Sequence, residues 1–169
     1  MSKIALKKEL MQLSHEQIVD VVLTAYASNK DIKEYFEFFL NPDVDKLYER
    51  FMKEIAKEVG RSKYHQSTAR ISRIKKTIKH FESFNPGVET VRDLRLATVE
   101  MLIVGELVNN YSDTLIKGTA RLLNDTISYA DKNRIFDSTI KQVDRIIAET
   151  QDRTRYFREY LKRHIELPH

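Results

Sequence analysis

The scarcity of glycine and proline is the feature that most restricts what this chain can fold into. Its 169 residues include only four glycines and three prolines. A β-sandwich or a β-barrel needs many tight turns built from these two residue types, so an all-β fold is excluded. Leu, Ile, Val and Phe make up about 29% of the chain, which is enough for a packed core although charged residues reach 32%. We therefore expect a folded, all-α protein.

Apolar residues recur at helical spacing along almost the whole chain, and capping and turn residues separate the helices. Ser14 and Gln17 form a capping box, Pro42 and Gly60 follow the ends of two helices, and Asn85-Pro86-Gly87 is the strongest turn signal. The expected helices cover residues 3–13, 15–26, 32–40, 44–59, 64–81, 90–108, 113–130 and 135–147, with a continuation at 156–165.

The length fits one domain, and the chain shows no self-similarity at a fixed period. Short connections favour antiparallel neighbours. Residues 1–169 therefore predict a single all-helical domain, either an irregular multi-helix bundle or a short stack of antiparallel helical hairpins, with an internal break near 85–87. The helix at 90–108 is apolar nearly all round in its middle, so we expect it at the centre of the fold.

Helix-forming strings dominate the first forty-two residues. They are Leu6-Lys7-Lys8-Glu9-Leu10, Leu13-Ser14, Glu16-Gln17-Ile18, and Asn29-Lys30-Asp31-Ile32-Lys33-Glu34-Tyr35-Phe36 through Leu40-Asn41-Pro42. In these strings the chain resembles a small all-helical bacterial family that is catalogued only as a domain of unknown function. The resemblance implies a helical fold and supplies no catalytic or binding residues.

Several classes of chemistry are excluded by what the sequence lacks. There is no cysteine, hence no disulfide, no thiolate nucleophile and no Cys-ligated metal. The five histidines form neither HExxH nor a Glu-x-x-His pair on two helices. Phosphate-binding Gly-rich loops, nucleophile elbows and kinase motifs are also missing. We expect no cofactor, no metal site and no enzymatic activity.

No segment of the sequence suggests a membrane span. The longest apolar run, residues 101–104, is far shorter than such a span, and residues 1–9 lack the apolar stretch of a secretory signal. We therefore expect a cytoplasmic protein.

Positive charge is concentrated between residues 61 and 81, which hold seven lysines and arginines and no acid. Because the whole chain carries a net charge of +4, the residues outside this segment have a net charge of −3. On a helix whose isoleucines face the core, these cations spread over the outward face. The candidate partner-binding residues are Arg70, Arg73, Lys75, Lys76 and Lys79.

This basic face has more than one interpretation. We expect a non-catalytic interaction module that binds an acidic protein surface through it. The alternative function is sequence-independent nucleic-acid binding through the same helix, and the cations could also simply pair with acids on neighbouring helices. A second basic stretch at 153–164 is interleaved with aromatic residues that we expect in the core. A homo-oligomer is possible if Tyr35, Phe38 or Phe39 remains exposed.

A polar group interrupts the apolar helix at 90–108 near its end. Glu106, Asn109, Asn110 and Asp113 share one side of that helix and its exit. An unpaired carboxylate is costly to bury, so Glu106 either pairs with an arginine from another helix or lines a polar pocket with a raised pKa. Gly105, inside the same helix, predicts a close packing contact.

Overall fold

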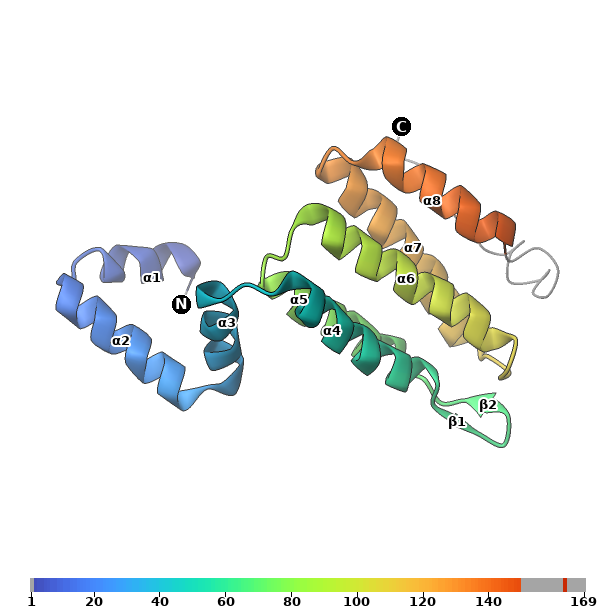
Figure 1. Cartoon of the computed structure of the whole chain (residues 1–169), viewed down its shortest axis with the longest axis horizontal. Helices are drawn as coiled ribbons and strands as arrows, with labels where there is room; N and C mark the ends of the chain where they lie inside the picture. Colours follow the sequence, from blue (N-terminus) through green and yellow to red (C-terminus); the bar gives the residue numbers. More distant parts are fainter. Residues whose placement is uncertain (1, 150–162, 164–169) are drawn as a thin grey trace. The chain divides into compact units, whose positions relative to one another are not determined.

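The structure is a computed structural model that describes residues 2–149 and 163, and the chain divides into two compact units, Met1–Asp43 and Val44–His169 (Figure 1). The first unit contains α1 (Lys3–Leu10), α2 (His15–Ser28) and α3 (Lys30–Leu40). The second contains α4 (Val44–Val59), β1 (Ser62–Lys63), β2 (Gln66–Ser67), α5 (Ile71–Ser83), α6 (Val88–Glu106), α7 (Asp113–Lys132) and α8 (Phe136–Glu149). The expected all-α class is confirmed. The predicted helix at 156–165 and the basic stretch at 153–164 lie outside the described residues, apart from Arg163.

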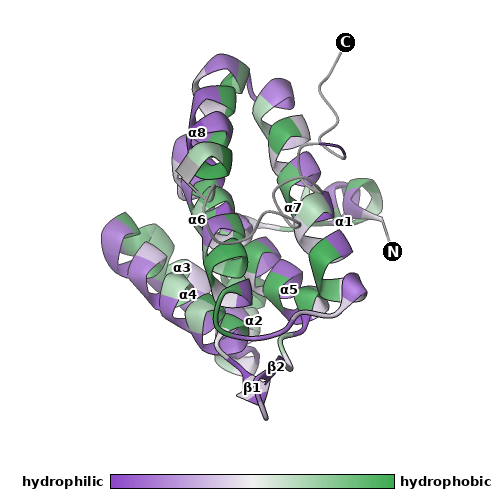
Figure 2. Cartoon of the chain, turned by 90° about the vertical axis from the view of Figure 1, so that its right-hand side faces the viewer, coloured by the Kyte–Doolittle hydropathy of each residue, from purple (hydrophilic) through white to green (hydrophobic). Residues whose placement is uncertain are grey.

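The second unit is organised around α6, as the sequence predicts. This helix contacts α4, α5, α7 and α8, and successive helices run side by side (Figure 1). Its core side chains are almost completely enclosed: Val91, Leu94, Leu96, Val99, Leu102 and Ile103. Figure 2 shows apolar residues along the facing sides of α6 and α7. Burial of these faces holds the unit together.

Aromatic residues pack between α4 and the C-terminal end of α5. The ring of Phe51 is 1% exposed and meets Phe81 and Phe84 edge-on, with centroid distances of 5.3 and 5.9 Å. His80 also meets Phe51, at 5.3 Å. The α4–α5 contact is therefore an aromatic cluster built from residues thirty positions apart in the chain.

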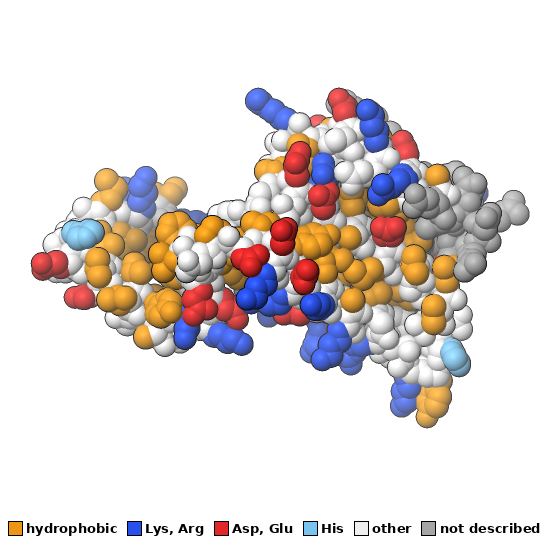
Figure 3. Space-filling view, viewed as in Figure 1, with side chains coloured by type: hydrophobic (Ala, Val, Ile, Leu, Met, Phe, Trp, Pro, Cys, Tyr) orange, Lys and Arg blue, Asp and Glu red, His pale blue; other side chains and the backbone are white. Residues whose placement is uncertain are grey.

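The first unit differs from the second in having no buried side chain among its described residues. The α2–α3 hairpin is its main helix contact, and the Tyr26 and Phe36 rings meet within it at 6.4 Å. The predicted capping box is present, because Ser14 accepts from the backbone of Gln17 and Gln17 accepts from that of Ser14. Apolar side chains cover much of the visible face of this unit in Figure 3.

The turn at 85–87 is present and separates α5 from α6, but both helices belong to the second unit. Gly87 there has φ of +108°, a value that suits glycine. The chain divides into its two compact units at Asp43, directly after the helix end at Asn41-Pro42. A single folding domain for residues 1–169 stays a prediction.

The helix predicted at 64–81 is wrong over its first seven residues. The chain forms a β-hairpin there, in which Ser62 pairs with Ser67 and Lys63 with Gln66, and α5 begins only at Ile71. Tyr64 and His65 at the tip have φ of 52° and 59°. Two consecutive left-handed residues make the tight turn typical of two-residue hairpins and cannot continue a helix.

Candidate functional site: a basic pocket between α5, α6 and α7

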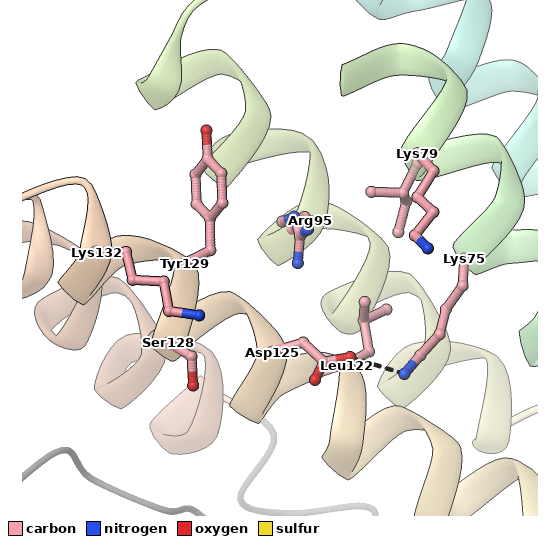
Figure 4. A pocket seen from close by; sticks show the side chains of 9 residues that line it. Lys75, Lys79, Arg95, Leu122, Asp125, Ser128, Tyr129 and Lys132 are labelled. Carbon is pink, nitrogen blue, oxygen red and sulfur yellow. Dashed lines mark hydrogen bonds and ion pairs between the residues drawn. The ribbon is translucent and has the colours of Figure 1, made fainter. Parts of the chain in front are cut away.

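A pocket of about 290 Å³ lies where α5, α6 and α7 meet, and four cationic side chains line it (Figure 4). Lys75 and Lys79 come from α5, one turn apart, Arg95 comes from α6, and Lys132 comes from the end of α7. The other lining residues are Ile78, Leu122, Asp125, Ser128 and Tyr129. With a single carboxylate among them, the lining has a net charge of +3.

Two of the four cations are held by carboxylates. Lys75 Nζ lies 2.8 Å from Asp125 Oδ2, an ion pair that joins α5 to α7. Arg95 donates from Nε to Glu82 Oε1 at 2.8 Å, and its guanidinium lies 5.0 Å from the centre of the Tyr129 ring. Burial, together with the nearby Glu82, raises the pKa of the Tyr129 phenol, which therefore stays neutral at physiological pH.

Lys79 and Lys132 have no carboxylate partner among the described residues. Figure 4 shows the two ammonium groups on opposite sides of the hollow, with Arg95 between them. Like charges that share a partly apolar pocket are stabilised by an anion, because each ammonium has unused donors. The pocket is thus suited to hold one negatively charged group.

The predicted basic face is divided by the structure. Arg70 is tied to α4, because its backbone N–H and its Nε both donate to Glu58 Oε1, at 3.0 and 3.3 Å. Burial raises the pKa of the Glu58 carboxyl, but hydrogen bonds from Arg70 outweigh this and bring it below its ordinary value. Lys75 is tied to α7. Arg70 and Lys75 therefore pair with acidic residues on neighbouring helices.

The other three candidates point to different sides of α5. Lys79 lines the pocket, whereas Arg73 and Lys76 are exposed and do not line it. Arg73 and His80 are seven residues apart, which is almost two full helical turns, so they lie on the same side of α5. His80 contacts Phe51, so this is the side of α5 that faces α4. Arg95 and Lys132 were not predicted, because they lie far from the basic segment in sequence and join it only through helix packing.

The hairpin was also missed, and a weak signal for it exists. The sequence has no aliphatic residue between Val59 and Ala69. Tyr64 was therefore the one large apolar residue that supported a helix before Ile71. The hairpin is fixed to the connection between α6 and α7 by Asn110, whose backbone N–H donates to His65 at 2.8 Å and whose carbonyl accepts from Ser67 at 2.9 Å. Tyr64 is 87% exposed at its tip.

The four residues of the polar group near the end of α6 differ in how far they are buried. Glu106 makes no ion pair within the described residues, and its Oε2 is buried without a hydrogen-bond partner there. Burial raises the pKa of this carboxyl. Asn109 is half-buried, while Asn110 and Asp113 are exposed. The pocket described above is lined by none of these four residues.

Tyr111 lies close enough to Glu106 for the charge of that carboxyl to act on its phenol. Its hydroxyl is buried and likewise unpartnered within the part of the chain that is described. Burial and the charge of Glu106 raise the pKa of the Tyr111 phenol to about 12. A Cβ built on Gly105 would collide with the Tyr111 hydroxyl and would lie 3.3 Å from Val59, which is the close contact that the glycine predicts.

Replacement of Glu106 by glutamine is expected to change how stability depends on pH. The folded carboxyl has a pKa above its ordinary value of 4.5, so the folded state binds more protons and the wild type loses stability as pH rises through the window between the two values. Glu106→Gln removes that loss. Urea unfolding between pH 4 and pH 8 should show the variant gaining on the wild type as pH increases; parallel curves would contradict the raised pKa.

Within residues 2–149 and 163, no three His, Asp or Glu side chains converge as they would to hold a metal ion. No helix in the same residues is both long enough and apolar enough to cross a bilayer.

The described fold thus defines a small all-α protein with a basic pocket in its second unit. Residues 1–165 match the model of DUF6155, a family of unknown function, and the chain belongs to that family. The match covers both units, so the three N-terminal helices are part of what the family shares. Comparison with curated proteins and with solved structures finds no match for the chain.

Proposed function

We propose that the protein is a non-catalytic, cytoplasmic interaction module that binds an acidic segment of a partner protein, with one carboxylate entering the pocket between α5, α6 and α7. The observation that carries the proposal is the pair of lysines, Lys79 and Lys132, which line one hollow and have no carboxylate partner within the described part of the chain. Ile78, Leu122 and the Tyr129 ring give the pocket apolar walls. Low local polarity strengthens a charge-assisted hydrogen bond formed there.

The pocket favours binding over catalysis. Among the described residues that line it, the one carboxylate, Asp125, is engaged by Lys75, and none is a histidine. Acid–base chemistry needs a group that can take up a proton near neutral pH. The lining instead supplies fixed positive charge, which recognises an anion without transforming it.

The arrangement of the cations favours an acidic peptide over a nucleic acid. A phosphate backbone is a regular row of charges and calls for a continuous basic track. Here Lys79 and Lys132 line opposite sides of one hollow, Asp125 lines the same hollow, and Arg73 lies on the other flank of α5. A single side-chain carboxylate fits that geometry better than a strand of phosphates.

The test compares two ligands and two sets of variants by fluorescence anisotropy. A labelled poly-Glu peptide and a single-stranded DNA of equal charge are titrated at about 50 and 200 mM salt. We expect the peptide to bind the wild type, and Lys79→Glu with Lys132→Glu to weaken binding at least about tenfold, because two charge-assisted contacts are lost. Arg73→Glu is the matched control, with the same kind of charge change outside the pocket, and should alter the Kd less than about threefold.

Other outcomes decide against the proposal. Absence of peptide binding at the lower salt concentration would overturn it. Tighter binding of DNA than of peptide, weakened equally by Arg73→Glu and by the two pocket substitutions, would replace it with the nucleic-acid alternative.

A further inference from the structure

The first unit exposes an unusual amount of apolar surface. Eight of its large apolar side chains are at least 40% exposed, and no described residue in Met1–Asp43 is buried. They are Ile4, Leu6, Met11, Val19, Val21, Leu23, Phe39 and Leu40. With ~200 Å² for a fully exposed large side chain, these residues together present on the order of 1,000 Å² of apolar surface, spread over the three helices.

The helix α2 has two apolar sides, and only one of them packs against another helix of the first unit. Ile18, Val22 and Tyr26 recur at four-residue spacing and are half-buried, and Tyr26 meets Phe36 of α3. Val19 and Leu23 form a second stripe, turned by about 100° from the first, and are 40% and 57% exposed. A helix that is apolar on two sides normally packs against neighbours on both.

The unit has few other means of stabilising itself. It is close to the size of about 40 residues below which a disulfide, a metal or association is usually needed. The chain has no cysteine, and the described residues hold no cluster fit for a metal. The helix α1, with eight residues and no buried side chain, is also far too short to be stable alone. Association with a second copy would supply such stabilisation.

We propose that the first unit is a dimerisation module, in which α1–α3 of one copy pack against α1–α3 of a second copy. The exposed apolar area matches the ~800 Å² that each partner contributes to a standard interface. Its apolar character is typical of permanent homodimers, whereas transient interfaces are no more apolar than ordinary surface. A second copy is also present whenever the chain is made, so the apolar side chains are covered from the time of folding.

The first experiment measures mass. Sedimentation equilibrium of the full chain at 1–100 µM should give twice the chain mass of 19.9 kDa. Leu23→Glu places a charge in the second stripe of α2 and should shift the dissociation constant at least about a hundredfold, because an unpaired charge would be buried. Val108→Glu is the matched control: Val108 is 70% exposed in the second unit, and its substitution should leave the dimer intact.

The second experiment locates the interface and uses the absence of native cysteine. Leu23→Cys and Val108→Cys each introduce one thiol, and maleimide labelling rates are compared at dimer-forming concentration. We expect the thiol at position 23 to react at least about tenfold more slowly than that at 108, and to speed up on dilution as the dimer dissociates. The small Cys substitution keeps this readout available if Leu23→Glu fails to fold, which far-UV circular dichroism would show.

Each contrary result overturns the inference. A wild-type monomer at 100 µM removes the dimer, whatever the labelling rates. A dimer that survives Leu23→Glu, or in which the two thiols react equally fast, has its interface outside the second stripe of α2 and contradicts the proposed module.

Discussion

Phe51→Ala is expected to lower the free energy of unfolding by about 3–5 kcal/mol, the range for removal of a fully buried aromatic side chain. Phe51 is 1% exposed, and its ring is enclosed by Phe81, Phe84 and His80. The guanidinium of Arg50 lies 4.9 Å from the centre of the Phe51 ring. Truncation would leave a cavity between α4 and α5 that rigid neighbouring rings cannot fill.

The measurement is urea unfolding followed by circular dichroism, with Tyr64→Ala as the control. Tyr64 is also aromatic, but it is 87% exposed and its ring lies 5.3 Å from Lys63 Nζ, so its loss should cost less than about 1 kcal/mol. Equal midpoints for the two variants would show that the aromatic cluster does not hold α4 against α5.

The helices could be predicted because their determinants are local. The capping box at Ser14, the break at Asn41-Pro42 and the turn at 85–87 act within a few residues, and each marks a helix boundary in the structure. The central place of α6 was predictable for a related reason, since a helix that is apolar on all sides needs neighbours on all sides.

Only a weak sequence signal indicates the hairpin, because its cause is not local. Tyr64 and His65 adopt left-handed conformations that neither residue favours. Backbone hydrogen bonds to Asn110, more than forty residues further along the chain, accompany the turn. Sequence patterns around Tyr64 carry no trace of that distant partner.

The basic face was predicted as a set, but its members have different roles. The partner of Arg70 is twelve residues away and that of Lys75 is fifty residues away, so their pairing depends on how the helices pack. The pocket joins Lys79 to Arg95 and Lys132 for the same reason. A charge run along one helix therefore indicates which residues are cationic, and tertiary structure decides which of them retain donors for a partner.

Gly105→Ala is expected to destabilise the protein by about 1–3 kcal/mol, because a Cβ at this position collides with the buried Tyr111 hydroxyl. Tyr111→Phe alone should stabilise by about 1 kcal/mol, since it removes a buried hydroxyl that has no partner among the described residues. In the Tyr111→Phe background, Gly105→Ala should become neutral or gain up to about 1 kcal/mol from the helix preference of alanine. The two changes therefore couple strongly.

A double-mutant cycle measured by urea unfolding tests this coupling, and Gly118 supplies the control. A Cβ on Gly118 would lie 2.8 Å from Ile71 Cγ1 and meets no part of Tyr111, so Gly118→Ala should cost the same in both backgrounds. A coupling energy of about 2 kcal/mol at Gly105 and none at Gly118 would show that position 105 needs a glycine because of the Tyr111 hydroxyl oxygen. Additive effects at both glycines would mean that the Tyr111 hydroxyl does not lie against α6.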